Sequence, residues 1–429
     1  MLSAVLKLGK FKLLLLSLVL LISGFLRFTE LGYSHFYGDE TKAVYYKKNI
    51  GAKEYFLSQR RPPLQFIFSW GTEKLSGGFD EGAIRLPFAI AGFLCSVLVF
   101  LIIYTAFGYW QGLLSTLIFS TNGFYIAYSR TVQYQSLFLL FGLTALFLAV
   151  LFWKKPKKTY LVCAGVSMAM ALLSHYDAVF FFVPVLYFLF TAPHNKNTSV
   201  IKTLLYFLVP ATLIPAAFYV PYFFSTYFTK NTYIYLQQRF SGTGLLPSSS
   251  LFTYFVYNPF KLTALIVLAL TIASVLLCGY KKMLPFILWT LVPFIVFEFI
   301  FSNPGTHIHN YVLPLLLTAG VGFVAVYEEL PKVFMLPVLV LFILNAVLQS
   351  FIFIPHLNRG YPWTDSEYGN VSLAKIPKDK YQIFIYGFPY NRGWDQLRDY
   401  FKSTKFTVPG GFNYSTNDNG VIGDYYLHP

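Results

Sequence analysis

Residues 11–27 read FKLLLLSLVLLISGFLR, a predominantly apolar run that ends on an arginine. A helix of about 20 apolar residues is long enough to cross the roughly 30 Å hydrocarbon core of a bilayer. Further runs of this character follow, so the sequence predicts an all-α polytopic membrane protein with about 11 transmembrane helices. We expect these spans near residues 11–27, 85–105, 110–128, 134–153, 159–175, 178–193, 203–224, 261–279, 283–301, 311–328 and 333–354.

The first apolar run has a second interpretation. The basic start and apolar centre of residues 1–27 also fit a cleavable signal peptide. However, no small-residue cleavage site follows the run, and Arg27 interrupts it. These two features favour a retained membrane anchor.

The composition of the chain agrees with a membrane protein. Of its 429 residues 56% are hydrophobic and only 12% are charged, whereas soluble domains carry about a quarter charged residues. The net charge of +15 would suit nucleic acid, but the Lys and Arg residues are dispersed among short loops and form no continuous basic face. We therefore exclude nucleic acid as a partner. The three cysteines lie inside apolar runs and indicate neither a disulfide framework nor a zinc site.

The distribution of lysines predicts the orientation of the chain. Short loops rich in Lys are retained on the cytoplasmic side of a membrane. Lysines precede the first predicted span and follow the fourth, sixth and eighth, which places all of them on one side. The short loops 129–133 and 302–310 on the other side contain only Arg130 between them. We therefore expect the loops 28–84 and 225–260 and the chain from residue 355 onward to lie outside the cytoplasm.

The chain is expected to divide near residue 354. Residues 1–354 are predicted to form the transmembrane module, including the external loop 28–84, and the apolar runs shorten beyond this point. Residues 381–386 predict a strand, and residues 394–401 predict a short helix. Residues 355–429 are therefore predicted to form a small extracytoplasmic α/β domain.

Asp39 and Glu40 lie in the first external loop, shortly after the first span. Ionisable groups near a membrane span cost free energy and are functional candidates for that reason. A carboxylate at the membrane surface can accept a proton from a hydroxyl nucleophile. The alternative is that Asp39 caps a following helix, because Asp favours the N-cap position. From these residues alone, the two roles are equally supported.

A series of motifs stands in a fixed order on the predicted outer side. They are Asp39-Glu40, Arg61-Pro62-Pro63-Leu64, Arg85-Leu86-Pro87, Tyr128-Ser129-Arg130 and, later, the stretch from His307 through His309 and Tyr311 to Pro314. This series resembles the GT-C membrane glycosyltransferases, specifically the branch that contains the protein O-mannosyltransferases and the aminoarabinose transferase of lipid A. The resemblance covers residues up to about 190 and the later stretch 307–314.

The resemblance implies an inverting transfer of one sugar from a polyprenyl-phosphate donor to a hydroxyl of a lipid, glycan or protein acceptor on the outer face of the membrane. Asp39 matches the catalytic carboxylate of the family, and Glu40 is implied to orient it or to bind the acceptor. Arg61 stands where the family commonly has Lys before two prolines, a position that contacts the lipid phosphate. A guanidinium can bind phosphate oxygens in a fork. The alternative is an arginine that only anchors the loop at the interface.

Other polar residues on the outer side are second-rank candidates. Arg85, Arg130, His309 and Tyr311 are further candidates for binding the donor phosphate, although arginines at helix ends also serve as interface anchors. The candidate substrate-binding residues, which also suit hydrated turns, are His175, Tyr176, Asp177, Arg239 and His307.

Arginine alone can neutralise a monophosphate leaving group, and no Asp-x-Asp triplet stands in an outer loop. We therefore expect no required metal and no other cofactor. The main alternative function is a flippase or transporter of lipid-linked sugars, but such folds commonly show internal repeats and midplane ionisable residues, which the sequence lacks. An O-antigen-type polymerase or ligase would concentrate its functional residues in a late loop rather than in the first one.

Overall fold

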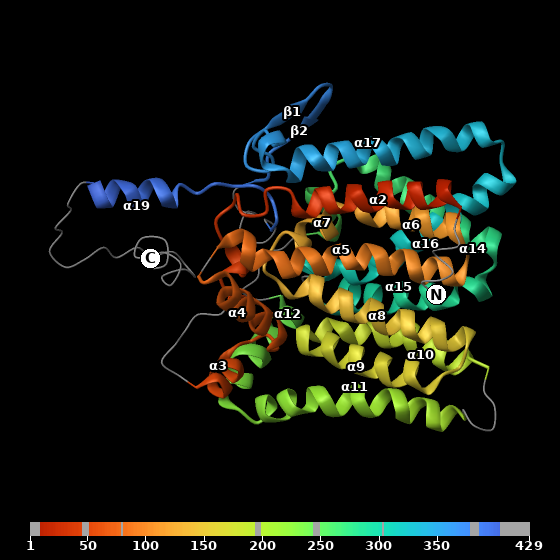
Figure 1. Cartoon of the computed structure of the whole chain (residues 1–429), viewed down its shortest axis with the longest axis horizontal. Helices are drawn as coiled ribbons and strands as arrows, with labels where there is room; N and C mark the ends of the chain where they lie inside the picture. The colour runs from red at the N-terminus through yellow and green to blue at the C-terminus, as the bar shows by residue number, and fades with distance from the viewer. Residues whose placement is uncertain are drawn as a thin grey trace.

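The computed structural model describes residues 9–44, 51–78, 80–193, 199–242, 249–302, 304–377 and 386–403. Long helices run side by side along one common direction and form a bundle (Figure 1). Shorter helices gather at one end of this bundle. A β-hairpin lies at the same end of the bundle (Figure 1).

Eight helical segments of the described chain are long and apolar enough to cross a membrane, so the protein is an integral membrane protein. Two of them include a short turn of 3₁₀ or π helix. The eight segments are α2 (Lys10–Phe28), α5 (Glu81–Ala106), α8 (Tyr134–Lys154), α11 (Val200–Phe223), α14 (Lys261–Cys278), α15 (Tyr280–Ile295) with η4 (Val296–Ile300), η5 (Gly305–Ile308) with α16 (His309–Glu329), and α17 (Met335–Phe353).

The remaining expected spans are helical but shorter. Helix α9 (Lys158–Ser174) and the pair η2 (Tyr176–Phe181) and α10 (Phe182–Thr191) are apolar. The span expected over 110–128 is divided into α6 (Tyr109–Ser120) and α7 (Gly123–Ser129). The division occurs because the Asn122 side chain accepts a hydrogen bond from the Phe124 amide, 3.1 Å away, and so starts a new helix. The expected number of 11 spans is therefore not confirmed.

Helix α16 occupies the centre of the bundle, and 83% of its most apolar stretch is buried. Glycines allow its neighbours to approach closely. A Cβ atom on Gly322 would lie 1.8 Å from the Leu270 carbonyl oxygen of α14, and one on Gly320 would lie 2.3 Å from the Ser115 backbone nitrogen of α6. Close approach of this kind is typical of helices that pack inside a membrane.

The loops at this end of the bundle pack against one another. Helices α3 (Ala52–Ser58), α4 (Leu64–Ser76) and α12 (Ile234–Ser241) lie at the same end of the bundle (Figure 1). Asn231, in the π-helical turn η3 (Phe228–Tyr233) before α12, donates a hydrogen bond of 2.8 Å to the Ser58 carbonyl oxygen. The first external loop and the segment after α11 therefore form one surface. Helix α13 (Ser250–Tyr257) follows in the chain.

The described C-terminal part is small. After η6 (Lys332–Phe334) and η7 (Pro355–Leu357), strands β1 (Ser366–Tyr368) and β2 (Val371–Leu373) pair antiparallel, and α19 (Trp394–Ser403) follows. The helix expected at residue 394 is thus present. The strand expected over 381–386 falls outside the described residues except for its last residue, and the division of the chain at residue 354 stays a prediction.

The contact between α14 and α16 can be tested through Gly322. We expect Gly322→Ala to lower the unfolding temperature, because the added methyl group must displace the Leu270 backbone and such overpacking costs about 1–3 kcal/mol. Thermal unfolding of the purified protein in detergent measures the effect. Gly71→Ala in α4 is the control, since nothing lies within 4 Å of the added atom. Equal unfolding temperatures for both variants would contradict the observed packing.

Candidate active site

Asp39 and Arg61 form an ion pair at the end of the bundle where the shorter helices lie. Asp39 lies within a 3₁₀ turn, η1 (Gly38–Glu40), and its Oδ2 is 2.6 Å from Nη2 of Arg61. The carboxylate accepts from this side chain, so the structure does not support a helix cap at Asp39. Arg61 is buried and directly precedes two prolines at the start of α4. The fixed φ angles of those prolines hold the backbone beside the guanidinium.

The charges around Asp39 determine its protonation. Burial alone would raise the pKa of the carboxyl, but Arg61, Lys42 and Arg60 outweigh this effect and hold the pKa below its usual range. In return, Asp39 outweighs the effect of burial on Arg61 and raises the pKa of the guanidinium. Asp39 is therefore an ionised carboxylate at neutral pH, with its side chain 27% exposed.

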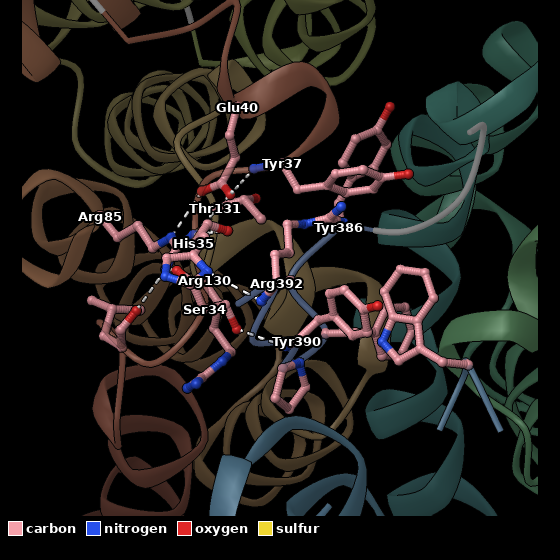
Figure 2. A pocket seen from close by; sticks show the side chains of 15 residues that line it. Ser34, His35, Tyr37, Glu40, Arg85, Arg130, Thr131, Tyr386, Tyr390 and Arg392 are labelled. Carbon is pink, nitrogen blue, oxygen red and sulfur yellow. Dashed lines mark hydrogen bonds and ion pairs between the residues drawn. The ribbon is translucent and has the colours of Figure 1, made fainter. Parts of the chain in front are cut away.

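Glu40 has a different environment from its neighbour. Its two oxygens lie 2.8 and 2.9 Å from Nε and Nη2 of Arg85, and both side chains are buried. Arg85 also donates to the carbonyl oxygens of Leu31 and Ser34 at 3.0 and 2.6 Å. Figure 2 shows Glu40 and Arg85 pointing toward each other. The donors of Arg85 are thus engaged within the protein, and we interpret this pair as an anchor of the loop rather than as the expected phosphate and acceptor ligands.

A cavity of about 120 Å³, which we call the Asp39 cavity, brings many of the predicted site residues together. Seven separate stretches of the chain contribute to it. Its lining residues are Asp39, Arg60, Arg61, Tyr134, His175, Tyr176, Tyr235, Arg239, Gly305, Thr306, His307 and Tyr386. Of the residues expected from the sequence, Asp39, Arg61, His175, Tyr176, Arg239 and His307 thus share one cavity.

Three guanidinium groups line the Asp39 cavity. Arg60 stacks on the ring of Tyr235, with 4.0 Å between the guanidinium carbon and the ring centroid. Arg239 donates to the Tyr235 hydroxyl at 2.8 Å and to the Pro304 carbonyl oxygen at 3.1 Å. Arg61 lies above the ring of Tyr134. Arg60 and Arg61 therefore both line the cavity.

An apolar groove of about 790 Å³ adjoins this cavity. Side chains of α9 and α11 line most of it, including Leu172, Ala211 and Phe223. Arg60 and Tyr176 line both the groove and the Asp39 cavity. A long apolar chain in the groove would therefore place its polar end beside the three arginines.

Asp177 lies behind the cavity wall in a cluster of polar side chains. Its Oδ2 is 2.6 Å from Nδ1 of His307 and 2.9 Å from Nδ2 of Asn310, and its Oδ1 is 3.2 Å from Nδ1 of His175. His309 does not line the cavity, and its Nδ1 lies 2.6 Å from the Thr306 carbonyl oxygen. Asp177 therefore orients two histidines that line the cavity.

Two other candidates lie away from the Asp39 cavity. Tyr311 donates a hydrogen bond of 2.6 Å to Glu298. Arg130 donates to the Leu26 carbonyl oxygen at 3.1 Å and lines a second cavity, of about 30 Å³. Figure 2 shows this second cavity, with His35, Arg130 and Arg392 among the side chains that line it.

Tyr386, which the sequence analysis did not select, lines both cavities. Gly387 allows this placement: its φ is +77°, and an added Cβ would lie 2.4 Å from the Ala127 carbonyl oxygen. The glycine after an aromatic residue was the available signal, but it gave no indication of where the segment would dock. The C-terminal segment thus completes a wall of the Asp39 cavity.

Comparisons with known proteins agree with this geometry. Residues 60–222 match the sequence model of the dolichyl-phosphate-mannose-protein mannosyltransferase family. No curated protein sequence matches the chain.

Two solved structures have a similar fold. The ArnT of Cupriavidus metallidurans bound to undecaprenyl phosphate has a TM-score of 0.53 and 16% identity, over 74% of this chain and 60% of that one. The oligosaccharyltransferase AglB of Archaeoglobus fulgidus, in complex with an inhibitory peptide and a dolichol-phosphate, has a TM-score of 0.52 and 11% identity, over 97% of this chain and 59% of that one. This chain therefore spans about three fifths of the length of these structures.

The helical bundle, with its site on the loops at one end, has the fold of the GT-C membrane glycosyltransferases. The match over 60–222 covers less than half of the chain and shows that this part is similar to the mannosyltransferase family. The resemblance seen in the sequence motifs is thereby confirmed.

The anchoring role of Glu40 predicts a loss of stability on its removal. Glu40→Ala leaves the Arg85 guanidinium buried without its carboxylate, which costs on the order of 3 kcal/mol or more. We expect a lower unfolding temperature and less folded protein after extraction. Glu73→Ala in α4 is the matched control and should have a smaller effect, since its partner Lys74 is exposed to solvent. A Glu40→Ala protein that is fully stable but fails to use acceptor would instead support acceptor binding by Glu40.

Proposed function

We propose that this chain is an inverting glycosyltransferase that moves a sugar from a polyprenyl-phosphate donor to an acceptor hydroxyl on the outer face of the membrane. The observation that carries this proposal is the meeting of the apolar groove and the Asp39 cavity at Arg60. A polyprenyl tail suits the groove, and its phosphate suits the three arginines beside it. The sugar would then lie near Asp39.

The two solved structures support the donor class. The ArnT structure is bound to undecaprenyl phosphate, and the AglB structure contains a dolichol-phosphate. Both ligands are polyprenyl phosphates. We therefore assign a donor of the same chemical type to this chain, with a lipid, glycan or protein as acceptor.

The proposed reaction is a single displacement. Asp39 accepts the proton of the acceptor hydroxyl, and the oxygen forms a bond to the anomeric carbon of the sugar. The bond from that carbon to the phosphate oxygen breaks, and its electron pair stays on the phosphate. The leaving phosphate thereby changes from a monoanion to a dianion. Arg60, Arg61 and Arg239 are placed to stabilise this additional charge.

The number of carboxylates in the Asp39 cavity supports the proposed inversion at the anomeric carbon. Among the described residues that line the cavity, Asp39 is the single carboxylate, because Glu40 is held by Arg85 and Asp177 lies behind the wall. A mechanism with a covalent sugar intermediate requires a nucleophile in addition to a base. One carboxylate therefore supports direct attack by the acceptor, with inversion at the anomeric carbon.

The orientation of the chain supports action on the outer face. Helix α2 begins with Lys10 and Lys12, and the stretch from the last residue of α8 to the first residue of α9 contains four more lysines. Asp39 follows α2 after one crossing and so lies at the opposite end. The lysine-rich end belongs on the cytoplasmic side. We also propose that the three arginines replace a divalent metal at the phosphate.

Asp39→Asn tests the proposed base. The amide cannot take up a proton, so we expect transfer to fall by about 10²- to 10⁴-fold while the protein still binds lipid phosphate. Purified protein supplied with a panel of polyprenyl-phosphate sugars measures the transfer. Because Arg61, Lys42 and Arg60 outweigh burial and hold the pKa of Asp39 below its usual range, the wild type should keep this base ionised to a lower pH than a free carboxyl group would.

Two outcomes would contradict this role of Asp39. Wild-type transfer by Asp39→Asn would remove it as the base. Movement of the lipid-linked sugar across the membrane without any transfer, in wild type and variant alike, would favour the flippase.

Arg61→Lys tests the phosphate site. Lysine keeps the charge but cannot bind with a fork, so we expect about tenfold weaker binding of polyprenyl phosphate. Arg398→Lys in α19 is the matched control, because Arg398 pairs with Asp395 and does not line the Asp39 cavity or the apolar groove. Binding is measured by titration of the purified protein with the lipid. Equal affinities in both variants would reject a phosphate role for Arg61.

A further inference from the structure

A third cavity, which we call the lysine cavity, shares a wall with the Asp39 cavity. Its volume is about 390 Å³, and Arg60, Arg61 and Tyr235 line both cavities. Lys42 and Lys230 line the lysine cavity but not the Asp39 cavity. Ligand pockets in proteins have volumes of about 300–1,000 Å³, so this cavity has room for a substrate. The donor groups placed above leave it empty.

Two segments of the chain form the lysine cavity, and direct contacts hold them together. One segment runs from η1 to the start of α4, and the other contains η3 and α12. Asn231 of η3 donates to the Ser58 carbonyl oxygen at 2.8 Å, and Arg60 stacks on Tyr235 of α12 at 4.0 Å. The cavity is therefore formed before a ligand enters it, which lowers the entropic cost of binding.

Positive charge dominates the lining of the lysine cavity. Its cationic residues are Lys42, Arg60, Arg61 and Lys230, and none of its described lining residues is a carboxylate. Asp39, which pairs with Arg61 at 2.6 Å, is the nearby negative charge. The four cations and this carboxylate leave an excess of three positive charges. A cavity lined by one sign of charge attracts ligands of the other sign.

Uncharged polar groups complete the lining. They are the hydroxyl of Ser58 and the side-chain amides of Gln59, Asn231 and Gln238. An amide offers both donors and an acceptor, as does the hydroxyl group that it would bind on a sugar. Cations interspersed with amides therefore suit a ligand that carries both acidic groups and many hydroxyls.

The position of Asp39 relates the two cavities to the proposed reaction. Its Oδ2 is 2.6 Å from Nη2 of Arg61, and its Oδ1 is 3.9 Å from Nζ of Lys42. Lys42 lines the lysine cavity, whereas Asp39 itself lines the cavity that we assign to the donor phosphate. A second substrate in the lysine cavity would thus reach the proposed base past Lys42.

We propose that the lysine cavity binds the acceptor, and that this acceptor is a glycan with carboxylate or phosphate groups. Lys42 and Lys230 bind the acidic groups, and the amides bind the sugar hydroxyls. This inference rests on the proposed function and narrows its acceptor, which that proposal leaves as a lipid, a glycan or a protein.

Two matched pairs of glycans test the preference for charge. One pair is a short oligogalacturonate and its methyl ester, and the other is a malto-oligosaccharide with and without a phosphate group. The members of each pair share one sugar backbone but differ in charge. The purified full-length protein, saturated with polyprenyl phosphate, is titrated with each glycan. We expect at least one acidic form to bind about tenfold or more tightly than its neutral form.

Gln238→Glu reverses this preference from within the cavity. It adds a negative charge with almost no change of shape, so we expect about tenfold weaker binding of the acidic glycan and unchanged binding of the neutral form. Gln237→Glu is the matched control, because Gln237 is exposed and does not line the cavity. It adds the same charge to the protein and should have a much smaller effect.

Lys230→Gln removes one of the proposed ligands of the acidic group. We expect about tenfold weaker binding of the acidic glycan, with unchanged affinity for polyprenyl phosphate, since Lys230 lines neither the apolar groove nor the Asp39 cavity. Lys74→Gln in α4 removes the same charge from an exposed position outside the cavity. This control measures the unspecific attraction of an acidic glycan to a basic protein. The unfolding temperature of each variant is measured alongside.

Three outcomes would count against these proposals. Equal affinities for the acidic and neutral forms in both pairs, or equal losses in Lys230→Gln and Lys74→Gln, would overturn the inference and leave the proposed function standing. Tighter binding of an acidic peptide than of either acidic glycan would overturn the assignment of a glycan. Failure of the wild-type protein to bind polyprenyl phosphate would instead overturn the proposed function.

Discussion

Glu40 is held by both of its oxygens in the fork of Arg85, and this buried ion pair anchors the first external loop to the start of α5. Burial of two charges costs desolvation, which is offset only when the remaining polar atoms are satisfied. The backbone amides of Val132 and Tyr37 complete the hydrogen bonds of Glu40. Consecutive residues of a 3₁₀ turn point in different directions. With Glu40 fixed inward, Asp39 faces Arg61 and the cavity.

The sequence predicted the parts of the site that depend on local signals. Apolar runs gave the helices, and the order of the motifs placed Asp39, Arg61 and His307 on one side of the membrane. The sequence did not distinguish residues that could bind substrate from residues that pair with other side chains within the protein. Arg85 forms an ion pair with Glu40, and Tyr311 donates a hydrogen bond to Glu298. Tertiary packing brings these partners together. Such pairing leaves no periodic pattern in a sequence.

The hydropathy pattern also did not predict two other features. These are the break in the third expected span and the part of the cavity wall that the C-terminal segment forms. The residues on both sides of Asn122 are mostly apolar, so their mean hydropathy predicts one continuous span. One side-chain hydrogen bond at Asn122 instead ends α6 and starts α7. This break is close to the site, since the loop after α7 leads to Tyr134 in the cavity wall. Tyr386 reaches the wall of the Asp39 cavity because Gly387 packs tightly against α7. Both features are set by single residues, whereas hydropathy averages over many.

The charges in the Asp39 cavity suit the charge that the proposed reaction develops on the phosphate. Arg60, Arg61 and Arg239 oppose the single carboxylate of Asp39, so the described lining carries an excess of two positive charges. A sugar phosphodiester would bring one negative charge, and the leaving phosphate would carry two. In the proposed reaction Asp39 gains a proton as the phosphate gains this charge, so the positive excess of the lining grows together with the negative charge that it faces. Groups fixed in advance for that charge stabilise the transition state more than the bound donor. Three features hold these groups in place. Glu40 anchors the loop, two prolines follow Arg61, and Arg60 stacks on Tyr235.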